Sequence, residues 1–286
     1  MRWSPTEGRW RRRQHRSLCA LGLAILWGLV ACAPLSLEQE RRIGVQMQAQ
    51  ASRQLPLLRD RVVLDYLRHL GQRLVHAAGP QPFAYHFYVV RDDEVNAFAM
   101  PAGYIYVNTG LILKARNVSE LAGVIGHEIG HVVKRHIAQN YNRQRSVGLA
   151  KEAGVMAAAL TLGAVGARTV DLVGGLSAMA VLNSFGREAE READAFAVEI
   201  LPRAGYDPEG MVSFFHTMLA EGGPDVPTFL SSHPATRERI AEAQALIQRL
   251  PPQPDLRSDD GGRFEIIQER VRLLTQGASR HRGRSE

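Results

Sequence analysis

A chain of 286 residues can form one full hydrophobic core or at most two small domains, and its 45% hydrophobic and 22% charged residues exclude a disordered protein. The formal net charge of +6 comes almost entirely from residues 1–31, which contain six arginines and one acidic residue. The rest of the chain is nearly neutral. Its net charge therefore indicates no nucleic-acid-binding surface, and we expect no nucleic-acid partner.

The N-terminal segment is typical of a bacterial export signal. Its arginine-rich stretch is followed by an apolar run over residues 18–30, which is too short to span a membrane comfortably. The run ends in Leu29-Val30-Ala31-Cys32, which resembles a lipobox. We predict that residues 1–31 are a signal peptide and that acylated Cys32 tethers the protein to a membrane; an uncleaved N-terminal anchor is the alternative. Ala33 follows the cysteine. By resemblance to Gram-negative lipoproteins, in which aspartate at this position is the usual retention signal, this implies a periplasmic protein anchored to the outer membrane.

Apolar spacing and turn residues predict the elements of the first half of the chain. Apolar residues three and four apart over residues 37–54 and 61–78 predict two amphipathic helices. Three short extended segments follow, at residues 85–90, 95–99 and 104–107. Because the Pro101-Ala102-Gly103 turn joins the last two, we expect a small antiparallel sheet.

The second half is predicted to be helical. Asn117, with Glu120 three residues later, predicts an N-cap and a helix over residues 118–140. Four more helices are predicted, at residues 182–201, 208–221, 234–250 and 264–276. Residues 151–182 are almost uncharged, and their uncharged runs are shorter than a membrane span. A packed helical hairpin, a lid over the active site and a segment dipping into lipid all remain open there.

The motif His127-Glu128-Ile129-Gly130-His131 predicts a metal site on the helix that starts after Asn117. Residues four apart lie on one helical face, so both imidazoles can reach one ion. Glu128 lies one step round the helix, where it can receive a proton from the attacking water without being a ligand. A histidine pair buried only for packing is the alternative, but two buried imidazoles and a carboxylate would each need partners. At nine residues from His127, His136 would lie on the opposite, solvent-facing side of a continuous helix.

A third metal ligand is expected from the acidic segment at residues 187–194. Catalytic zinc usually takes three protein ligands and keeps one position for water. At 100° per residue, Glu190 and Asp194 share a helical face with the small and apolar residues Ala193, Ala197 and Leu201, whereas Glu188, Glu192 and Glu199 lie on the opposite face. We therefore predict Glu190 as the ligand and Asp194 as the hydrogen-bond acceptor for a ligand imidazole.

These motifs together resemble the HtpX / CAAX-prenyl-endopeptidase family of gluzincin zinc proteases. The resemblance rests on HEIGH, on Glu190 with Asp194, on the strand-turn segment at residues 96–103, and on Ser232-His233-Pro234 followed by Arg239. Within this family the sequence most resembles the periplasmic BepA/LoiP type. The resemblance implies a lipoprotein without a large repeat domain. It implies an α+β, predominantly helical, zincin-like domain with one Zn²⁺ per chain. We expect this domain to span residues 32–250, followed at 251–286 by a linker, a short helix and a polar tail.

The resemblance also implies roles for residues outside the HEIGH motif. His233 and Arg239 correspond to a histidine and an arginine that lie near the zinc in this family. His233 would either donate to the oxyanion of the tetrahedral intermediate or cap the zinc in a closed resting state. Pro234 suits the first turn of a helix, which would put Arg239 on its second turn. Substrate would add as an extra strand along the edge formed by residues 95–100, in which Asn96, Ala97, Phe98 and Ala99 are the predicted substrate-binding residues.

The implied function is zinc-dependent hydrolysis of peptide bonds in unfolded or misassembled envelope proteins, as quality control of outer-membrane proteins. A zinc-containing chaperone or assembly factor that binds such proteins without cutting them is the alternative. Glu128 argues against it, because a binding protein needs no base beside its metal. A narrowly specific processing protease and the oligomeric state are left open.

Overall fold

The computed structural model describes residues 34–144, 185–220, 229, 232–234 and 236–282. The chain divides into two units, residues 1–35 with 141–172 and residues 36–140 with 173–286, and the second holds nearly all described residues. The predictions for the signal peptide, Cys32 and residues 151–182 lie outside the described residues. Within the described part, no helix is both long enough and apolar enough to cross a membrane.

The two N-terminal helices form where their apolar spacing predicts them. Helix α2 (Leu37–Gln54) begins at a capping box, in which Ser36 Oγ accepts a hydrogen bond from Gln39 N and Gln39 Oε1 accepts one from Ser36 N. Helix α3 (Arg61–Ala77) begins at Asp60, whose side chain accepts from Val63 N. The prediction is confirmed for both helices to within one residue.

The sheet contains β1 (His86–Val90), β2 (Ala97–Met100) and β3 (Tyr104–Asn108), in the order β1-β3-β2. Strands β2 and β3 pair antiparallel, as predicted, through a turn in which Ala102 and Gly103 have φ of 65° and 89°. Strand β1 pairs parallel with β3, so the prediction of an antiparallel sheet is wrong for this pair. The hairpin folds β3 back between β1 and β2, which gives β3 the direction of β1.

Helix α5 (Val118–Val133) carries the HEIGH motif and follows a short helix, α4 (Thr109–Lys114), that the sequence did not predict. Asn117 Oδ1 accepts a hydrogen bond from Glu120 N at 3.0 Å, which confirms the predicted N-cap. The predicted continuation to residue 140 is wrong. Arg135 has a φ of 59°, which interrupts the helix, and the chain is helical again from residue 136.

The C-terminal half supplies four described helices: α8 (Arg187–Arg203), α9 (Glu209–Ala220), α11 (Arg237–Ile247) and α12 (Arg263–Arg282). Helix α12 is longer than the predicted short helix, and it packs on α3 and α4. Phe264 and Val271 are fully buried in that contact region. This helix therefore contributes to the same core as the rest of the unit.

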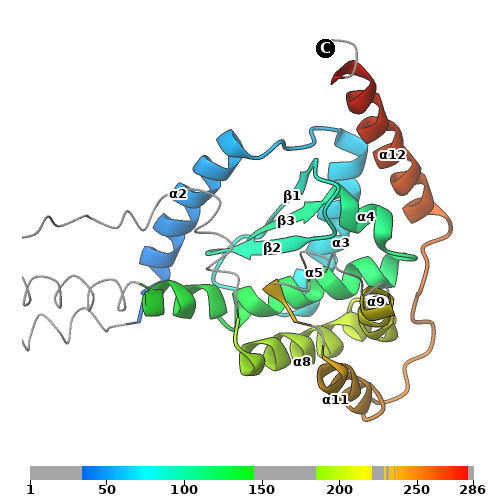
Figure 1. The fold of residues 1–286 in the computed structure, drawn as a ribbon. Helices are drawn as coiled ribbons and strands as arrows, with labels where there is room; N and C mark the ends of the chain where they lie inside the picture. The colour runs from blue at the N-terminus through cyan, green and yellow to red at the C-terminus, as the bar shows by residue number, and fades with distance from the viewer. Residues whose placement is uncertain (1–33, 145–184, 221–228, 230–231, 235, 283–286) are drawn as a thin grey trace, which may run out of the picture. The chain divides into compact units, whose positions relative to one another are not determined.

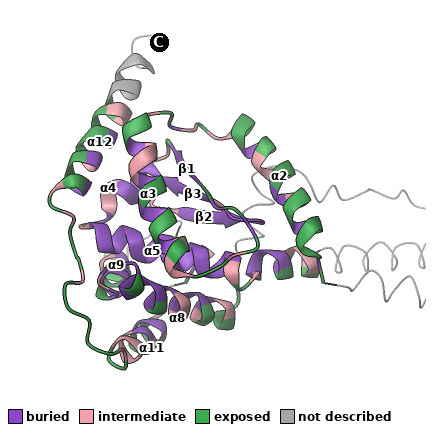
Figure 2. Cartoon of the chain, turned by 180° about the vertical axis from the view of Figure 1, so that it is seen from behind, coloured by how far each residue is buried: buried purple, intermediate pink, exposed green. Residues whose placement is uncertain are grey.

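Helix α5 lies at the centre of the core, with the sheet on one side and α8 on the other (Figure 1). It is buried from Val118 to Val132, as the continuous purple of α5 in Figure 2 shows. Its glycines permit this packing. A Cβ on Gly123 would lie 2.7 Å from Met211 Cα in α9, and one on Gly130 would lie 3.0 Å from Ala193 Cα in α8. The close approach of α8 brings its acidic face next to the HEIGH histidines.

Candidate metal centre

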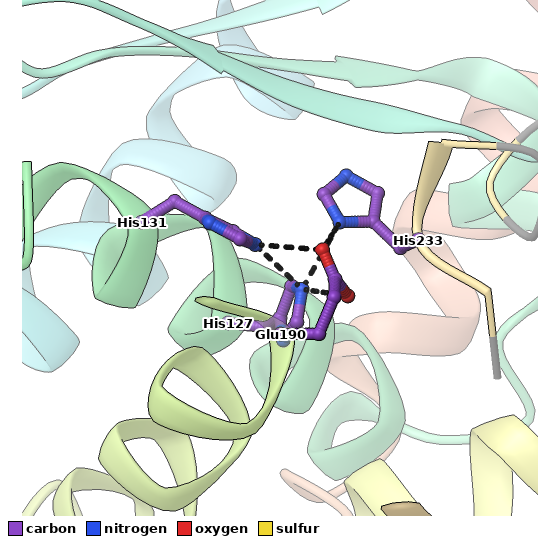
Figure 3. A group of neighbouring side chains, drawn as sticks. All are labelled: His127, His131, Glu190 and His233. Atoms are coloured by element: carbon purple, nitrogen blue, oxygen red, sulfur yellow. Dashed lines mark hydrogen bonds and ion pairs between the residues drawn. The ribbon is translucent and has the colours of Figure 1, made fainter. Parts of the chain in front are cut away.

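Four buried side chains from three parts of the chain point toward one another (Figure 3). His127 and His131 come from α5, Glu190 from α8, and His233 from the segment before α11. His127 Nε2 lies 3.0 Å from His131 Nε2 and 3.2 Å from His233 Nδ1, and Glu190 Oε1 lies 3.0 Å from His233 Nδ1. One donor atom from each of the four lies within 4.8 Å of all the others. The structure thus brings together the three predicted ligands and adds His233 as a fourth donor.

Glu128 lies beside this cluster and is fully buried. Among the described residues, neither of its carboxylate oxygens has a hydrogen-bond partner, and Oε1 lies 3.4 Å from His233 Nε2. Burial raises the pKa of Glu128 above its usual value. A buried carboxylate without hydrogen bonds is costly in a folded protein, and sites of function are where such groups persist.

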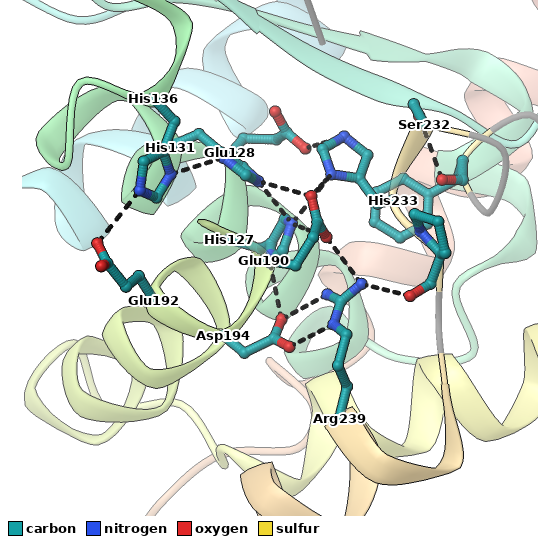
Figure 4. Close-up of polar contacts among 12 residues, drawn as sticks. His127, Glu128, His131, His136, Glu190, Glu192, Asp194, Ser232, His233 and Arg239 are labelled. Atoms are coloured by element: carbon teal, nitrogen blue, oxygen red, sulfur yellow. Dashed lines mark hydrogen bonds and ion pairs between the residues drawn. The ribbon is translucent and has the colours of Figure 1, made fainter. Parts of the chain in front are cut away.

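Arg239 connects Glu190 and Asp194, the two buried acidic residues of α8 (Figure 4). Its Nε and NH2 donate to the two oxygens of Asp194 at 2.7 and 2.8 Å, and its NH1 lies 2.7 Å from Glu190 Oε2. Asp194 Oδ1 in turn lies 2.9 Å from His127 Nδ1. Burial opposes the charge on Asp194, but hydrogen bonds from Arg239 and His127 outweigh it and lower the pKa of Asp194. Asp194 therefore remains an acceptor that fixes the His127 ring.

The charges and donor atoms of the site fit a divalent cation. The three buried carboxylates of Glu128, Glu190 and Asp194, against the one Arg239 guanidinium, leave a formal charge of −2 when the imidazoles are neutral. Burial opposes a proton on His127, yet Asp194 and Glu190 raise the pKa of His127 to about 9, so the site favours positive charge. Two imidazoles and a carboxylate are the donors of catalytic zinc sites, and a zinc ion would balance the charge.

The predicted substrate-binding residues lie on β2 and just before it. Strand β2 is at an edge of the sheet and packs against α5. Ala97 and Ala99 are buried, whereas Asn96 and Phe98 are half-buried. Phe98 stacks on Tyr106 of β3 with ring centroids 5.0 Å apart. In the described part of the chain, no strand pairs with the outer side of β2, so its main chain can accept an added strand.

Two placements differ from the sequence-based expectation. Thr236 caps α11, so Pro234 lies before the helix and Arg239 lies in its first turn, not its second. His136, predicted at the surface, is 4% exposed, because the interruption at Arg135 turns it inward. The segment around Arg135 contains no glycine or proline, so no local signal marks this turn.

The glutamates of α8 divide between its two faces as predicted. Glu190 and Asp194 are buried, together with Ala193, Ala197 and Leu201. The side chains of Glu188, Glu192 and Glu199 are 78%, 46% and 55% exposed. The helical phase derived from the sequence is therefore confirmed.

Residues 64–247 match Peptidase family M48. The chain is 32% identical over 237 residues to the beta-barrel assembly-enhancing protease of Escherichia coli (strain K12), a match that covers 82% of this chain and 49% of the relative. It is 35% identical over 161 residues to the metalloprotease LoiP of the same organism, covering 56% of this chain and 60% of LoiP. The mitochondrial metalloendopeptidase OMA1 of Arabidopsis thaliana is 36% identical over 165 residues, covering 57% and 32%. The chain thus spans about half the length of the assembly-enhancing protease.

We expect Glu190→Gln to lose bound zinc, because the amide removes the charge of one of three ligands from a buried site. Glu188→Gln is the matched control, since Glu188 lies on the same helix with its side chain in solvent. Zinc content of the purified proteins, measured by atomic absorption, checks this. Zinc retained by Glu190→Gln, or lost from Glu188→Gln, would contradict the assignment.

Proposed function

Because the chain belongs to Peptidase family M48, we propose that it is a zinc-dependent endopeptidase in which His127, His131 and Glu190 hold the metal. The observation that carries this proposal is the cluster of four buried donor groups with the fully buried carboxylate of Glu128 beside it. The Glu128 carboxylate favours a catalytic site, because a site that bound metal only for stability would need no additional buried base.

The residues of the chain divide the chemistry between them. Bound zinc would supply a Lewis acid that polarises the scissile carbonyl and lowers the pKa of the attacking water. Glu128 takes the proton from that water and passes it to the leaving amine, since its oxygens have no competing hydrogen bond among the described residues. Asp194 holds the His127 ring in place, and Arg239 holds Glu190 and Asp194.

The substrate class we propose is unfolded or misassembled envelope protein. An extended segment would pair with the outer edge of β2, where no described strand pairs, through main-chain hydrogen bonds that tolerate many side chains. Two relatives, from Yersinia pestis and Escherichia coli, are each 32% identical to this chain and bear the name beta-barrel assembly-enhancing protease. That name supports a substrate among the proteins of the envelope. Quality control of outer-membrane proteins is the role that follows.

We propose that the protein works in the periplasm, anchored through lipid on Cys32 to the outer membrane. The export-signal pattern and the lipobox-like sequence before Cys32 support this location. Acyl chains on Cys32 would then provide the attachment. Fractionation of cells that produce Cys32→Ser tests the anchor, and a variant that stays fully membrane-bound would contradict it.

His233 is proposed to cap the metal in the arrangement seen here. Its Nδ1 lies within 3.2 Å of both His127 Nε2 and Glu190 Oε1, so it occupies a fourth donor position beside the proposed ligands, the position that a catalytic zinc keeps for water. This geometry supports the capping role over donation to the oxyanion. Withdrawal of His233 would open the site.

For Glu128→Gln we expect normal zinc content and a fall in peptide-bond hydrolysis of at least about a hundredfold, because the amide cannot accept the proton. Cleavage of a fluorescently labelled unfolded protein, with and without a chelator, measures the effect. Wild-type protein that binds such substrates without cutting them would instead support the chaperone alternative. Near-normal hydrolysis by zinc-loaded Glu128→Gln would refute the mechanism.

For His233→Ala we expect faster cleavage of the same substrate, because removing the imidazole leaves the metal open. Zinc affinity should fall at the same time, since a fourth donor is lost. The rate is measured with zinc in excess, so that both proteins are fully loaded. A slower rate at full loading would show that His233 acts on the reacting atoms instead of covering them.

A further inference from the structure

A second polar chain reaches the metal ligands through His136 (Figure 4). His131 Nδ1 lies 3.0 Å from His136 Nδ1, and His136 Nε2 lies 3.2 Å from Glu192 Oε2. The His136 residue is 4% exposed, whereas the Glu192 side chain is 46% exposed. The chain therefore runs from a buried ligand to a carboxylate at the surface.

The backbone after α5 is arranged so that His136 can reach His131. Arg135 adopts a φ of 59°, and its Nε donates to Glu40 Oε2 of α2 at 2.8 Å. Glu40 is 1% exposed, so this ion pair is shielded from solvent on the carboxylate side. A non-glycine residue at this φ is uncommon and persists where surrounding contacts hold it. The turn places the His136 ring edge-on to the His131 ring, beside its Nδ1, with ring centroids 5.1 Å apart.

The positions of the protons along this chain follow from the role of His131. His131 Nε2 faces His127 Nε2 at 3.0 Å, so it is the nitrogen available for metal and must be unprotonated. The ring proton of neutral His131 is then on Nδ1, which donates to His136 Nδ1. His136 consequently carries its own proton on Nε2, which donates to Glu192 Oε2. Each bond in the chain determines the tautomer of the next ring.

We propose that His136 is a positioning residue for the metal ligand His131. It accepts a hydrogen bond from Nδ1–H of His131 and so holds His131 Nε2 toward the metal. This inference rests on the proposed zinc site. A hydrogen bond to the second nitrogen of a ligand histidine fixes the ring and increases its basicity. Glu192 supports His136 by accepting a hydrogen bond from its Nε2–H.

The two histidines of the HEIGH motif are thus held in different ways. His127 donates to Asp194, a buried carboxylate clamped by Arg239, while His131 donates to a neutral imidazole whose own acceptor is partly in solvent. Water can replace Glu192 at its exposed position, but it has little access to the buried position that the His136 acceptor occupies. The acceptor nitrogen of His136, rather than the carboxylate, therefore carries the effect on metal binding.

The competing explanation is that His136 only fills space beside His131. Phe185 already packs beside both histidines. Its ring stacks on His131 with centroids 3.9 Å apart, and its centroid lies 6.1 Å from that of His136. An aromatic ring without a nitrogen would satisfy a packing role. Two substitutions separate the explanations, because His136→Phe keeps a ring and loses the acceptor, whereas His136→Asn loses the ring and keeps an acceptor oxygen at the δ position.

The experiment measures zinc affinity of the full-length wild type, His136→Phe and His136→Asn by competition with a chromophoric chelator. We expect affinity about 10- to 100-fold lower for His136→Phe, as for other losses of a hydrogen bond to a ligand histidine. His136→Asn should bind zinc close to the wild-type affinity. Circular dichroism confirms folding of each protein, and the visible spectrum of its cobalt(II) form reports on the ligand arrangement. We expect a changed spectrum for His136→Phe alone.

Wild-type affinity in folded His136→Phe would overturn the inference, as would a His136→Asn protein that is as weak as His136→Phe. Either result leaves the proposed function intact, provided that the wild type binds zinc and cleaves substrate. A wild type that binds no zinc would overturn the proposed function and this inference with it.

Discussion

The arrangement of the site depends on the Arg239 guanidinium. Glu190 and Asp194 lie four residues apart on one face of α8 and are 1% and 3% exposed. Two buried carboxylates so close together would repel each other and lose their hydration, at a cost of several kcal/mol for each. Arg239 neutralises both carboxylates and replaces part of their hydration, since three of its nitrogens lie within 2.8 Å of their oxygens. Asp194 can then orient His127, and Glu190 can face the histidines as a ligand.

The helices can bring these groups together because their packing is unusually close. Gly130 lies between the two HEIGH histidines and Gly123 lies one turn before His127. A Cβ on Gly123 would clash with Met211 of α9, and one on Gly130 would lie in tight contact, 3.0 Å, with Ala193 of α8. A larger residue at either would push α8 or α9 away from α5. Displacing α8 in this way would change the position of Glu190 relative to His127 and His131. The glycine inside HEIGH therefore serves the geometry of the metal centre as well as the core.

The sequence predicted what depends on local periodicity. The helical phase of α8 and the four-residue spacing of His127 and His131 are properties of single helices, and the structure agrees with both. Other contacts between distant segments were beyond such reasoning, although the approach of Glu190 and Asp194 to the HEIGH histidines was predicted from the needs of a metal site. The parallel pairing of β1 with β3 depends on where the hairpin docks. The inward position of His136 depends on Arg135, whose partner Glu40 is 95 residues away. His233, 106 residues from His127, was reached through family resemblance alone.

Arg239 also links the carboxylates of α8 to the segment that carries His233, the proposed cap of the metal. NH1 donates to the carbonyl of Pro234 at 2.8 Å, directly after His233, so Arg239 also holds the segment that carries the cap. Among the described residues, Nε and NH2 bind only Asp194, and NH1 also lies 2.7 Å from Glu190. Releasing Pro234 would therefore break one of the contacts of NH1 and leave both carboxylates neutralised. The contacts of Arg239 with Glu190 and Asp194 do not involve the Pro234 carbonyl, so withdrawal of His233 in its proposed capping role would not require their loss.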